Sequence, residues 1–272
     1  MATSKSVESW KEAKETFEQF SGDWIFRGHL DAEWELETSL YRWMGDIKRS
    51  SVGRDFMELE DIEKLMLEGF KKGVHHYLSS SLHLPKTTLE WLSLMQHYGA
   101  PTRLLDFTRS PYVASFFAFE EIKKVENCAV WAVNESWCKK ESIENFNNKY
   151  KDKEEFKPLE ISVDLSEEIK FNEVILKGEK LPCMVFPVCP KHLHKRLINQ
   201  QGLFLCPGDL YVTFNKHLEN LLANAVSNIK KIIMPIKCRE DAIKDLELMN
   251  INSATLFSGL DGYVRSLRNI VY

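Results

Sequence analysis

The sequence lacks the motifs that mark several common enzyme classes. It has no Gly-x-x-x-x-Gly-Lys-Ser/Thr phosphate loop, no Gly-x-Gly-x-x-Gly turn, no Gly-x-Ser-x-Gly elbow and no His-Glu-x-x-His pair. Each of these motifs supplies a defined piece of chemistry, from phosphate binding to zinc ligation. Their absence removes the main support for a kinase, a Rossmann dehydrogenase, an α/β-hydrolase or a zinc protease.

Long apolar runs and closely paired cysteines are also missing. No apolar segment approaches the length of a membrane span, and the amino terminus has no apolar signal core. The six cysteines include no Cys-x-x-Cys pair and lie in apolar contexts, which is typical of buried thiols in a reducing compartment. We therefore expect a cytoplasmic protein that does not act at a membrane.

Neither sign of charge dominates. The 272 residues carry a net charge of −4, with 44% hydrophobic and 28% charged residues, as in an ordinary soluble globular protein with a sizeable core. This balance gives no support to a sequence-independent nucleic-acid binder, although a local basic groove stays open. His192 and His194 have no third ligand at a recognisable spacing, so we predict no metal site.

Polar residues suited to chemistry gather in residues 96–111, QHYGAPTRLLDFTRSP. Upstream, Thr87 and Glu90 have the spacing of a capping box, which predicts a helix beginning there. Residues 104–108 are long enough for only a short buried strand, and Ser110 followed by proline is typical of the start of a second helix. The sequence therefore predicts a helix–strand–helix corner.

This corner would bring polar side chains together against an apolar wall. Four polar residues, Arg103, Asp106, Thr108 and Arg109, lie between two apolar elements, which is the usual make-up of a ligand pocket. Alternatively, Arg103 and Asp106 pair with each other, and Thr108 serves only as a helix cap. The residues alone leave both interpretations open.

A second candidate is an arginine at the end of a buried strand. In residues 24–28, WIFRG, a strand alternation puts Ile25 and Arg27 on one face. Arg27 leaves this strand just before a glycine, either to face a ligand or to pair with Asp23 or Asp31.

A third candidate lies in residues 196–208, where three adjacent amides precede a glycine and a buried strand. One of Asn199, Gln200 and Gln201 is predicted to point across the sheet. There an amide can both donate and accept, which suits ribose hydroxyls or another amide. The alternative is an amide that ties down the loop backbone.

The other periodic segments predict an α+β fold. Helices are expected over 6–20, 55–77, 215–226, 239–249 and from 260 onward, and strands over 128–133, 183–188, 210–214 and 229–236. Residues 34–42 are expected to form an extended or turning segment that covers the strand at 24–28, and the mixed charges of 135–160 indicate a solvated helix or a loop insertion. Because no strict βαβ alternation appears, we predict one domain over 1–272 with a mixed or antiparallel sheet core and surrounding helices.

Four separated pieces of the chain together resemble the FRG domain, a family named for its Phe-Arg-Gly. They are Phe26-Arg27-Gly28, the motif across 96–111, Gln201-Gly202-x-Phe204, and residues 255–262, TLFSGLDG, in which Ser258-Gly259 replaces a more usual Pro-Asp. The resemblance extends from about Trp24 to the carboxyl end.

A more distant similarity to ADP-ribosyltransferases of the Arg-Ser-Glu class implies a fold and a co-substrate. In that class an Arg-Gly on the first strand holds the phosphates or ribose of NAD, and Arg27-Gly28 stands at this place. Residues 106–118 resemble the class's Ser-Thr-Ser strand and helix, so His97 and Thr108 are expected to frame the nicotinamide ribose. The implied cofactor-binding set is Arg27, Gly28, His97, Thr102, Arg103 and Thr108.

The implied catalytic residues are Arg27, Asp106 and Gln201. The third motif of the class carries a glutamate that stabilises the ribosyl cation, whereas this chain has Gln200, Gln201 and Gly202 there. An amide orients a ribose but supplies no negative charge. The resemblance therefore leaves Asp106 or Gln201 to polarise the ribose hydroxyl.

The resemblance thus implies an NAD-dependent ADP-ribosyltransferase-like enzyme or NAD glycohydrolase, acting as a bacterial toxin, effector or phage-defence protein on a protein or nucleic-acid acceptor. The missing glutamate favours a second hypothesis, a non-catalytic nucleotide sensor that uses the same pocket. A third hypothesis, a protein-interaction module, rests on the 11% aromatic content and on the charged tract over 135–160.

Overall fold

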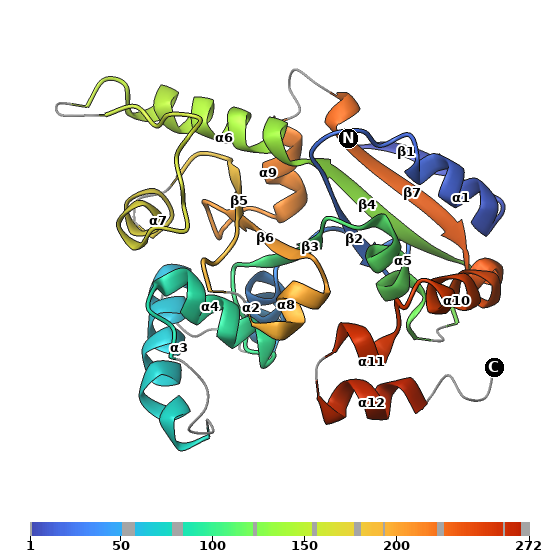
Figure 1. Cartoon of the computed structure of the whole chain (residues 1–272). Helices are drawn as coiled ribbons and strands as arrows, with labels where there is room; N and C mark the ends of the chain where they lie inside the picture. Colours follow the sequence, from blue (N-terminus) through green and yellow to red (C-terminus); the bar gives the residue numbers. More distant parts are fainter. Residues whose placement is uncertain are drawn as a thin grey trace.

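A computed structural model gives the arrangement of the chain (Figure 1). It describes residues 2–50, 58–77, 84–121, 124–153, 157–176, 181–192, 194–221, 226–257 and 259–267. Ser258 of the proposed closing motif, and the first residues of the helix predicted over 55–77, lie outside the described residues. In the parts that are described, no helix combines the length and apolar character needed to cross a bilayer.

The centre of the fold is a seven-stranded mixed sheet with the order β1-β7-β4-β2-β3-β6-β5. Its strands are β1 (Thr3–Ser6), β2 (Trp24–His29), β3 (Leu105–Thr108), β4 (Asn127–Asn134), β5 (Val185–Val188), β6 (Gly202–Pro207) and β7 (Ile229–Pro235). β1 pairs with β7 in parallel, and every other neighbouring pair is antiparallel. The predicted α+β class with a mixed sheet is therefore confirmed.

Helices surround this sheet (Figure 1). They are α1 (Trp10–Phe17), α2 (Ser39–Ser50), α3 (Leu59–Gly73), α4 (Thr88–His97), α5 (Pro111–Phe119), α6 (Glu135–Tyr150), α7 (Glu168–Val174), α8 (Lys195–Asn199), α9 (Phe214–Leu221), α10 (Arg239–Leu248), α11 (Ser253–Leu256) and α12 (Leu260–Ser266). Short 3-10 turns occupy Val74–His76, Val226–Asn228 and Ile236–Cys238.

Alternate strand residues bury opposite faces of the sheet, as the sequence alternation predicts. Phe26 and Val130 pack with Phe116 in a cluster that α1, α5 and α10 complete. Their neighbours Ile25 and Trp131 belong to a separate cluster that includes residues of α9. Both faces of β2 and β4 are therefore covered, which makes these strands the centre of the core.

Three segments differ from their predicted structure. Residues 39–42, predicted as extended or turning, begin the helix α2. Residues 3–6 form the edge strand β1, so the amino-terminal helix begins at Trp10 rather than at residue 6. Residues 210–213 form no strand, because the Asp209 carboxylate accepts a hydrogen bond from the Tyr211 N–H at 2.7 Å and turns the chain. The Thr213 hydroxyl then accepts from the Lys216 N–H at 3.2 Å, at the start of α9. Local turn chemistry overrides the apolar pattern there.

The first part of the charged tract is the helix α6. One side of it is buried, through Cys138, Ser142, Ile143, Phe146 and Tyr150. Ser142 also joins it to β5, donating to the Val185 carbonyl at 2.7 Å and accepting from the Val185 N–H at 2.9 Å. This helix therefore covers the β5 end of the sheet, while its charged residues lie on the other side.

The predicted helix–strand–helix corner is formed by α4, β3 and α5. Thr87 and Glu90 make the full capping box, since each side chain accepts from the other residue's N–H at 3.3 Å. Ser110 caps α5 by accepting from the Val113 N–H at 3.3 Å, with proline at the first helical position. The local signals in the sequence are sufficient to fix this corner.

Candidate functional site

A cavity lies where the sheet opens between β2 and β3. In the described chain, Phe26 and Thr108 form the one register pair between these strands, whereas β2 pairs with β4 along its whole length. Beyond that pair the two strands diverge, and a cavity of about 670 Å³ occupies the opening. It is lined by Phe26, Arg27, Gly28, His29, Leu30, Trp34, Glu35, Glu37, Arg42, Asp106, Phe107, Thr108, Phe117, Glu120, Arg196 and Gln200. This volume is that of a small-molecule or cofactor site.

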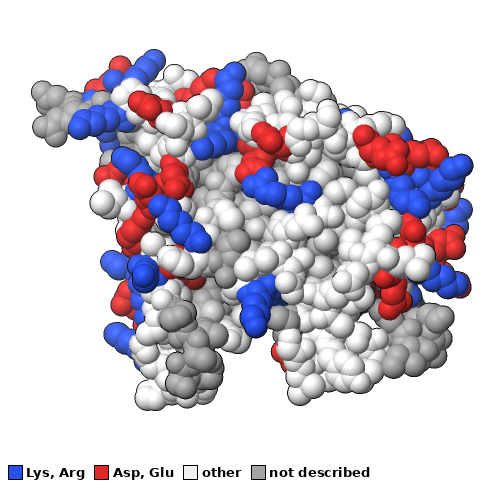
Figure 2. Space-filling model, viewed as in Figure 1, with Lys and Arg blue, Asp and Glu red and all other residues white. Residues whose placement is uncertain are grey.

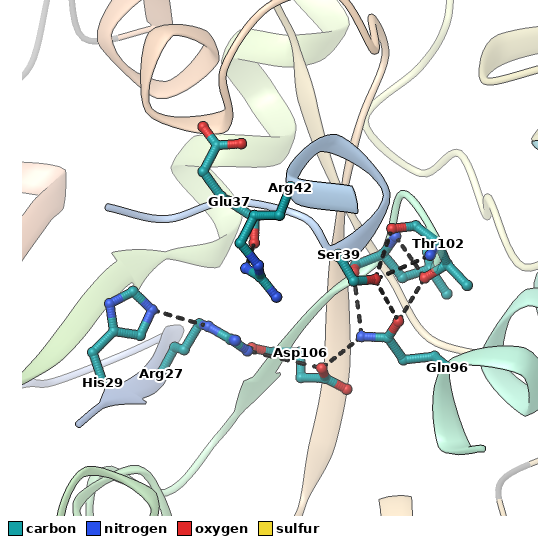
Figure 3. A network of polar contacts seen from close by, with 9 residues as sticks. Arg27, His29, Glu37, Ser39, Arg42, Gln96, Thr102 and Asp106 are labelled. Atoms are coloured by element: carbon teal, nitrogen blue, oxygen red, sulfur yellow. Dashed lines mark hydrogen bonds and ion pairs between the residues drawn. The ribbon is translucent and has the colours of Figure 1, made fainter. Parts of the chain in front are cut away.

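Arg27 stands at the opening and is held on two sides. Its Nε donates to His29 Nε2 at 3.3 Å, and its Nη1 donates to the Asp106 carbonyl at 2.8 Å. The same Nη1 lies 3.8 Å from the Asp106 carboxylate (Figure 3). Among the described residues no acceptor contacts Nη2, so its two N–H groups stay available. Arg27 thus pairs with Asp106 rather than with Asp23 or Asp31.

His29 is an uncharged acceptor for Arg27. Its Nδ1 lies 3.3 Å from the Trp34 carbonyl, so a ring that accepts at Nε2 carries its hydrogen on Nδ1. Burial, followed by the nearby Arg27 charge, lowers the pKa of His29 to about 3. At neutral pH the positive charge of this group therefore resides on Arg27 alone.

Asp106 is positioned by an amide behind it. The Gln96 side chain donates from Nε2 to Asp106 Oδ2 at 2.7 Å, and its Oε1 accepts from the Thr102 hydroxyl at 2.6 Å and from the Ser39 hydroxyl at 3.5 Å (Figure 3). These hydrogen bonds orient the Gln96 amide so that its N–H donor faces the Asp106 carboxylate. The Asp106 side chain is 51% exposed and lines the cavity. Thr102 acts behind it and does not line the cavity.

Arg103 does not pair with Asp106 and lies outside the cavity lining. Its side chain is fully buried against Glu63, to which Nε donates at 2.7 Å and 3.0 Å and Nη2 also donates. Nη1 donates to the Ile175 carbonyl at 3.2 Å. Its position is that of a structural ion pair inside the fold.

The remaining predicted residues are divided between the cavity and its surroundings. Thr108 lines the cavity, and its hydroxyl donates to the Gln200 carbonyl at 2.6 Å. Gln200 also lines the cavity, whereas Gln201 is exposed outside it with a φ of 48°. His97 lies outside the lining, with its ring 4.5 Å from that of His194.

Gly28 lines the cavity and also lets a helix approach β2. A Cβ at this position would meet the Ala114 carbonyl oxygen at 1.9 Å and the Ala118 nitrogen at 2.7 Å. The glycine therefore permits α5 to cross the strand at close range, which brings Phe117 and Glu120 to the cavity wall.

The charged cavity residues that sequence reasoning missed include Glu37, Arg42 and Arg196, besides Glu35 and Glu120. The first two lie in or just before α2, and the third lies in α8. The segment 34–42 was expected to cover β2, which was the available signal for Glu37 and Arg42. Arg42 donates from Nη1 to the Glu37 carbonyl at 2.6 Å, and its guanidinium points toward the Arg27–Asp106 contact (Figure 3).

The Glu37 carboxyl is poised to titrate near neutral pH. Its Oε1 accepts from the Phe214 N–H at 3.2 Å, but its Oε2 is buried and has no hydrogen-bond partner in the described structure. Burial, followed by repulsion from Glu35, raises the pKa of Glu37 to about 7, against the opposing effect of Arg42. A carboxyl at this pKa changes its charge within the physiological range.

Replacing Glu37 by glutamine is expected to flatten the dependence of stability on pH. Because folding raises this pKa from 4.5 to about 7, the protonated folded state is favoured. The contribution of Glu37 protonation to the free energy of unfolding is complete below about pH 4.5 and is lost as the pH rises through 7. It amounts to up to about 3 kcal/mol. Urea unfolding between pH 4 and pH 8 should therefore show Glu37→Gln gaining on the parent as the pH rises. Parallel curves would contradict the assignment.

Comparison with known proteins gives one match. The family model of the FRG domain matches residues 22–127, a span that runs from just before β2 to the first residue of β4 and contains Arg27, Gln96 and Asp106. No curated protein and no solved structure matches the chain. The network that joins β2 and β3 thus lies inside the matched span, and the chain contains an FRG domain over residues 22–127.

Proposed function

We propose that this cavity binds NAD and that the protein cleaves its nicotinamide–ribose bond, as an ADP-ribosyltransferase-like enzyme or an NAD glycohydrolase. The observation that carries the proposal is the contact between Arg27 and Asp106 at the opening of the sheet. It places a guanidinium with a free donor beside a half-exposed carboxylate in one cavity. A dinucleotide needs both charges, one for its phosphates and one for the cation that forms as its glycosidic bond breaks.

Arg27 and Arg42 are assigned to the pyrophosphate. A guanidinium makes two parallel hydrogen bonds to phosphate oxygens and stays charged at every accessible pH. The two side chains come from β2 and α2 and face the same space (Figure 3). Trp34 and Phe117 supply aromatic surface in the cavity lining against which a base or a nicotinamide ring can pack.

Asp106 is assigned to the reacting ribose. In the reaction the C1′–N bond breaks, nicotinamide leaves with the electron pair, and the acceptor or water attacks C1′ and releases a proton to solvent. The ribose carries positive charge in between, and a fixed carboxylate beside it lowers the barrier. Of the two groups implied for this task, Asp106 lines the cavity and Gln201 does not. Use of this chemistry as a toxin, effector or phage-defence protein belongs to the same proposal.

The proposal is tested by measuring NAD binding by calorimetry and nicotinamide release by chromatography. Arg27→Ala is expected to weaken NAD binding by about tenfold to a hundredfold, because it removes charge-assisted hydrogen bonds of about 1.5–3 kcal/mol. Asp106→Asn should retain binding but lower release by about a hundredfold or more. Arg109→Ala is the matched control, since Arg109 pairs with Glu135 outside the cavity lining. Unchanged NAD affinity in Arg27→Ala would refute the assignment.

A second candidate is a nucleotide sensor without turnover. It is favoured because Gln96 and Arg27 already contact the Asp106 carboxylate. In addition, β6 contributes no carboxylate to the described cavity lining. This function predicts saturable binding that depends on Arg27, with no nicotinamide released. Release above the spontaneous rate would exclude it.

A further inference from the structure

Arg196 reaches the cavity from α8, on the side of β6, and its guanidinium has no acceptor among the described residues. No hydrogen bond or ion pair from it to any described residue is found; its Cζ lies 4.8 Å from the centre of the Phe257 ring. An arginine carries five N–H donors that need partners when they leave water. Arg196 is partly buried and lines the cavity, so a ligand in this space would lie beside it.

The carboxylates around Arg196 are engaged elsewhere. Glu120 lines the same cavity but pairs with Arg265 at 3.3 Å, and Arg265 itself lies over Phe257 at 4.2 Å. Asp106 is held by Gln96 and Arg27. Burial lowers the pKa of Arg196 from its ordinary value, and repulsion from Arg265 acts in the same direction, whereas attraction from Asp106 and Glu120 opposes them. The arginine remains charged. This part of the cavity therefore holds a positive charge that no described carboxylate pairs with directly, although Asp106 and Glu120 attract it from a distance.

We propose that Arg196 is a second phosphate-binding position, separate from Arg27 and Arg42. The proposal deepens the proposed function because it uses the same cavity. Arg196 precedes β6, on one side of Asp106's strand β3, whereas Arg27 lies on β2, on the other side. A planar guanidinium that donates to no described residue matches the oxygens of a phosphate ester. The phosphate comes from one of two sources: a further phosphate on the dinucleotide, as in NADP, or a phosphodiester of a nucleic-acid acceptor.

The mixed charge on the face of the molecule drawn in Figure 2 favours a single recognised phosphate over a long electrostatic track. Acidic and basic side chains are interspersed over the face in Figure 2, around a largely uncharged middle. Lys195, next to Arg196 on α8, is exposed and does not line the cavity. It is therefore a matched control for the general effect of one positive charge at this position.

The experiment measures binding of NAD, NADP and a short single-stranded DNA oligonucleotide to the parent chain, Arg196→Gln and Lys195→Gln. Arg196→Gln is expected to weaken NADP or the oligonucleotide by about tenfold or more, while NAD changes by less than about twofold. Lys195→Gln should leave NAD and NADP affinity unchanged. Arg196→Lys, which keeps the charge without the fork, should weaken the same ligand by less, and it replaces Arg196→Gln if that variant does not fold.

The outcomes separate the two proposals. An effect confined to NADP assigns the phosphate to the dinucleotide, and one confined to the oligonucleotide assigns it to the acceptor. If NAD binds but the affinities for NADP and the oligonucleotide do not depend on Arg196, the proposal of a second phosphate-binding position is refuted. It is also refuted if Arg196→Gln weakens NAD binding as much as it weakens binding of NADP and the oligonucleotide. Oligonucleotide binding that depends on Arg196 without any NAD binding would overturn the proposed function and leave this inference standing.

Discussion

Replacement of Glu63 by alanine is expected to lower the free energy of unfolding by about 3–5 kcal/mol, because the partner charge of Arg103 would stay buried without compensation. The two side chains are only 1% and 4% exposed. Arg103 donates to both carboxylate oxygens and has one further acceptor, the Ile175 carbonyl. Without Glu63, the Arg103 N–H groups that donate to its carboxylate would have no acceptor there in the protein interior.

Urea unfolding at neutral pH measures this effect. Glu68→Ala is the control, since Glu68 lies on the same helix, is half exposed and pairs loosely with Lys71 at 3.7 Å; its cost should stay within about 0.5 kcal/mol. The double variant Glu63→Leu with Arg103→Met should recover much of the loss, because apolar replacement of both charges removes the uncompensated one. A cost for Glu63→Ala no larger than for Glu68→Ala would contradict the account.

Arg103 also shows where sequence reasoning stops. An arginine in a polar loop after a helix has the same local pattern whether it binds a ligand or an internal carboxylate. Its partner Glu63 lies 40 residues earlier, on a helix whose apolar period was visible but whose buried carboxylate was not. The pairing depends on how α3 packs near α4, and no short-range signal in the chain encodes that arrangement.

Features fixed by neighbouring residues were predicted correctly. The capping box at Thr87, the start of α5 at Ser110 and the alternation of Ile25 and Phe26 across β2 each depend on contacts within a few residues or on strand geometry. β1 was missed because an isolated four-residue strand gains its structure from pairing with β7, far along the chain.

The cavity could be predicted only in part, for the same reason. Arg27 and Asp106 were both singled out, but their contact depends on the divergence of β2 from β3 after a single register pair. Arg42, Glu37 and Arg196 reach the opening from separate elements, and no motif spacing connects them. Tertiary packing, rather than local pattern, therefore decides which polar residues share this site.

The substitution Gly28→Ala is expected to destabilise the fold by about 3 kcal/mol or more, at the upper end of the cost of overpacking. The added Cβ would meet backbone atoms of Ala114 and Ala118 in α5, which cannot rotate away as a side chain would. The helix would have to move off β2. Because α5 carries Phe117 and Glu120 into the cavity wall, NAD binding should weaken together with stability.

Thermal and urea unfolding of Gly28→Ala, beside Gly69→Ala, give the matched comparison. Gly69 lies within α3 with no atom within 4 Å of an added Cβ, so alanine there should stabilise by up to about 1 kcal/mol. The result also separates two roles for Gly28. If the Gly28→Ala variant is folded and fully stable but no longer binds NAD, the ligand itself needs the absence of a side chain at this position. A joint loss of stability and binding would mean that the helix needs it, and the distances to Ala114 and Ala118 lead us to expect the second result.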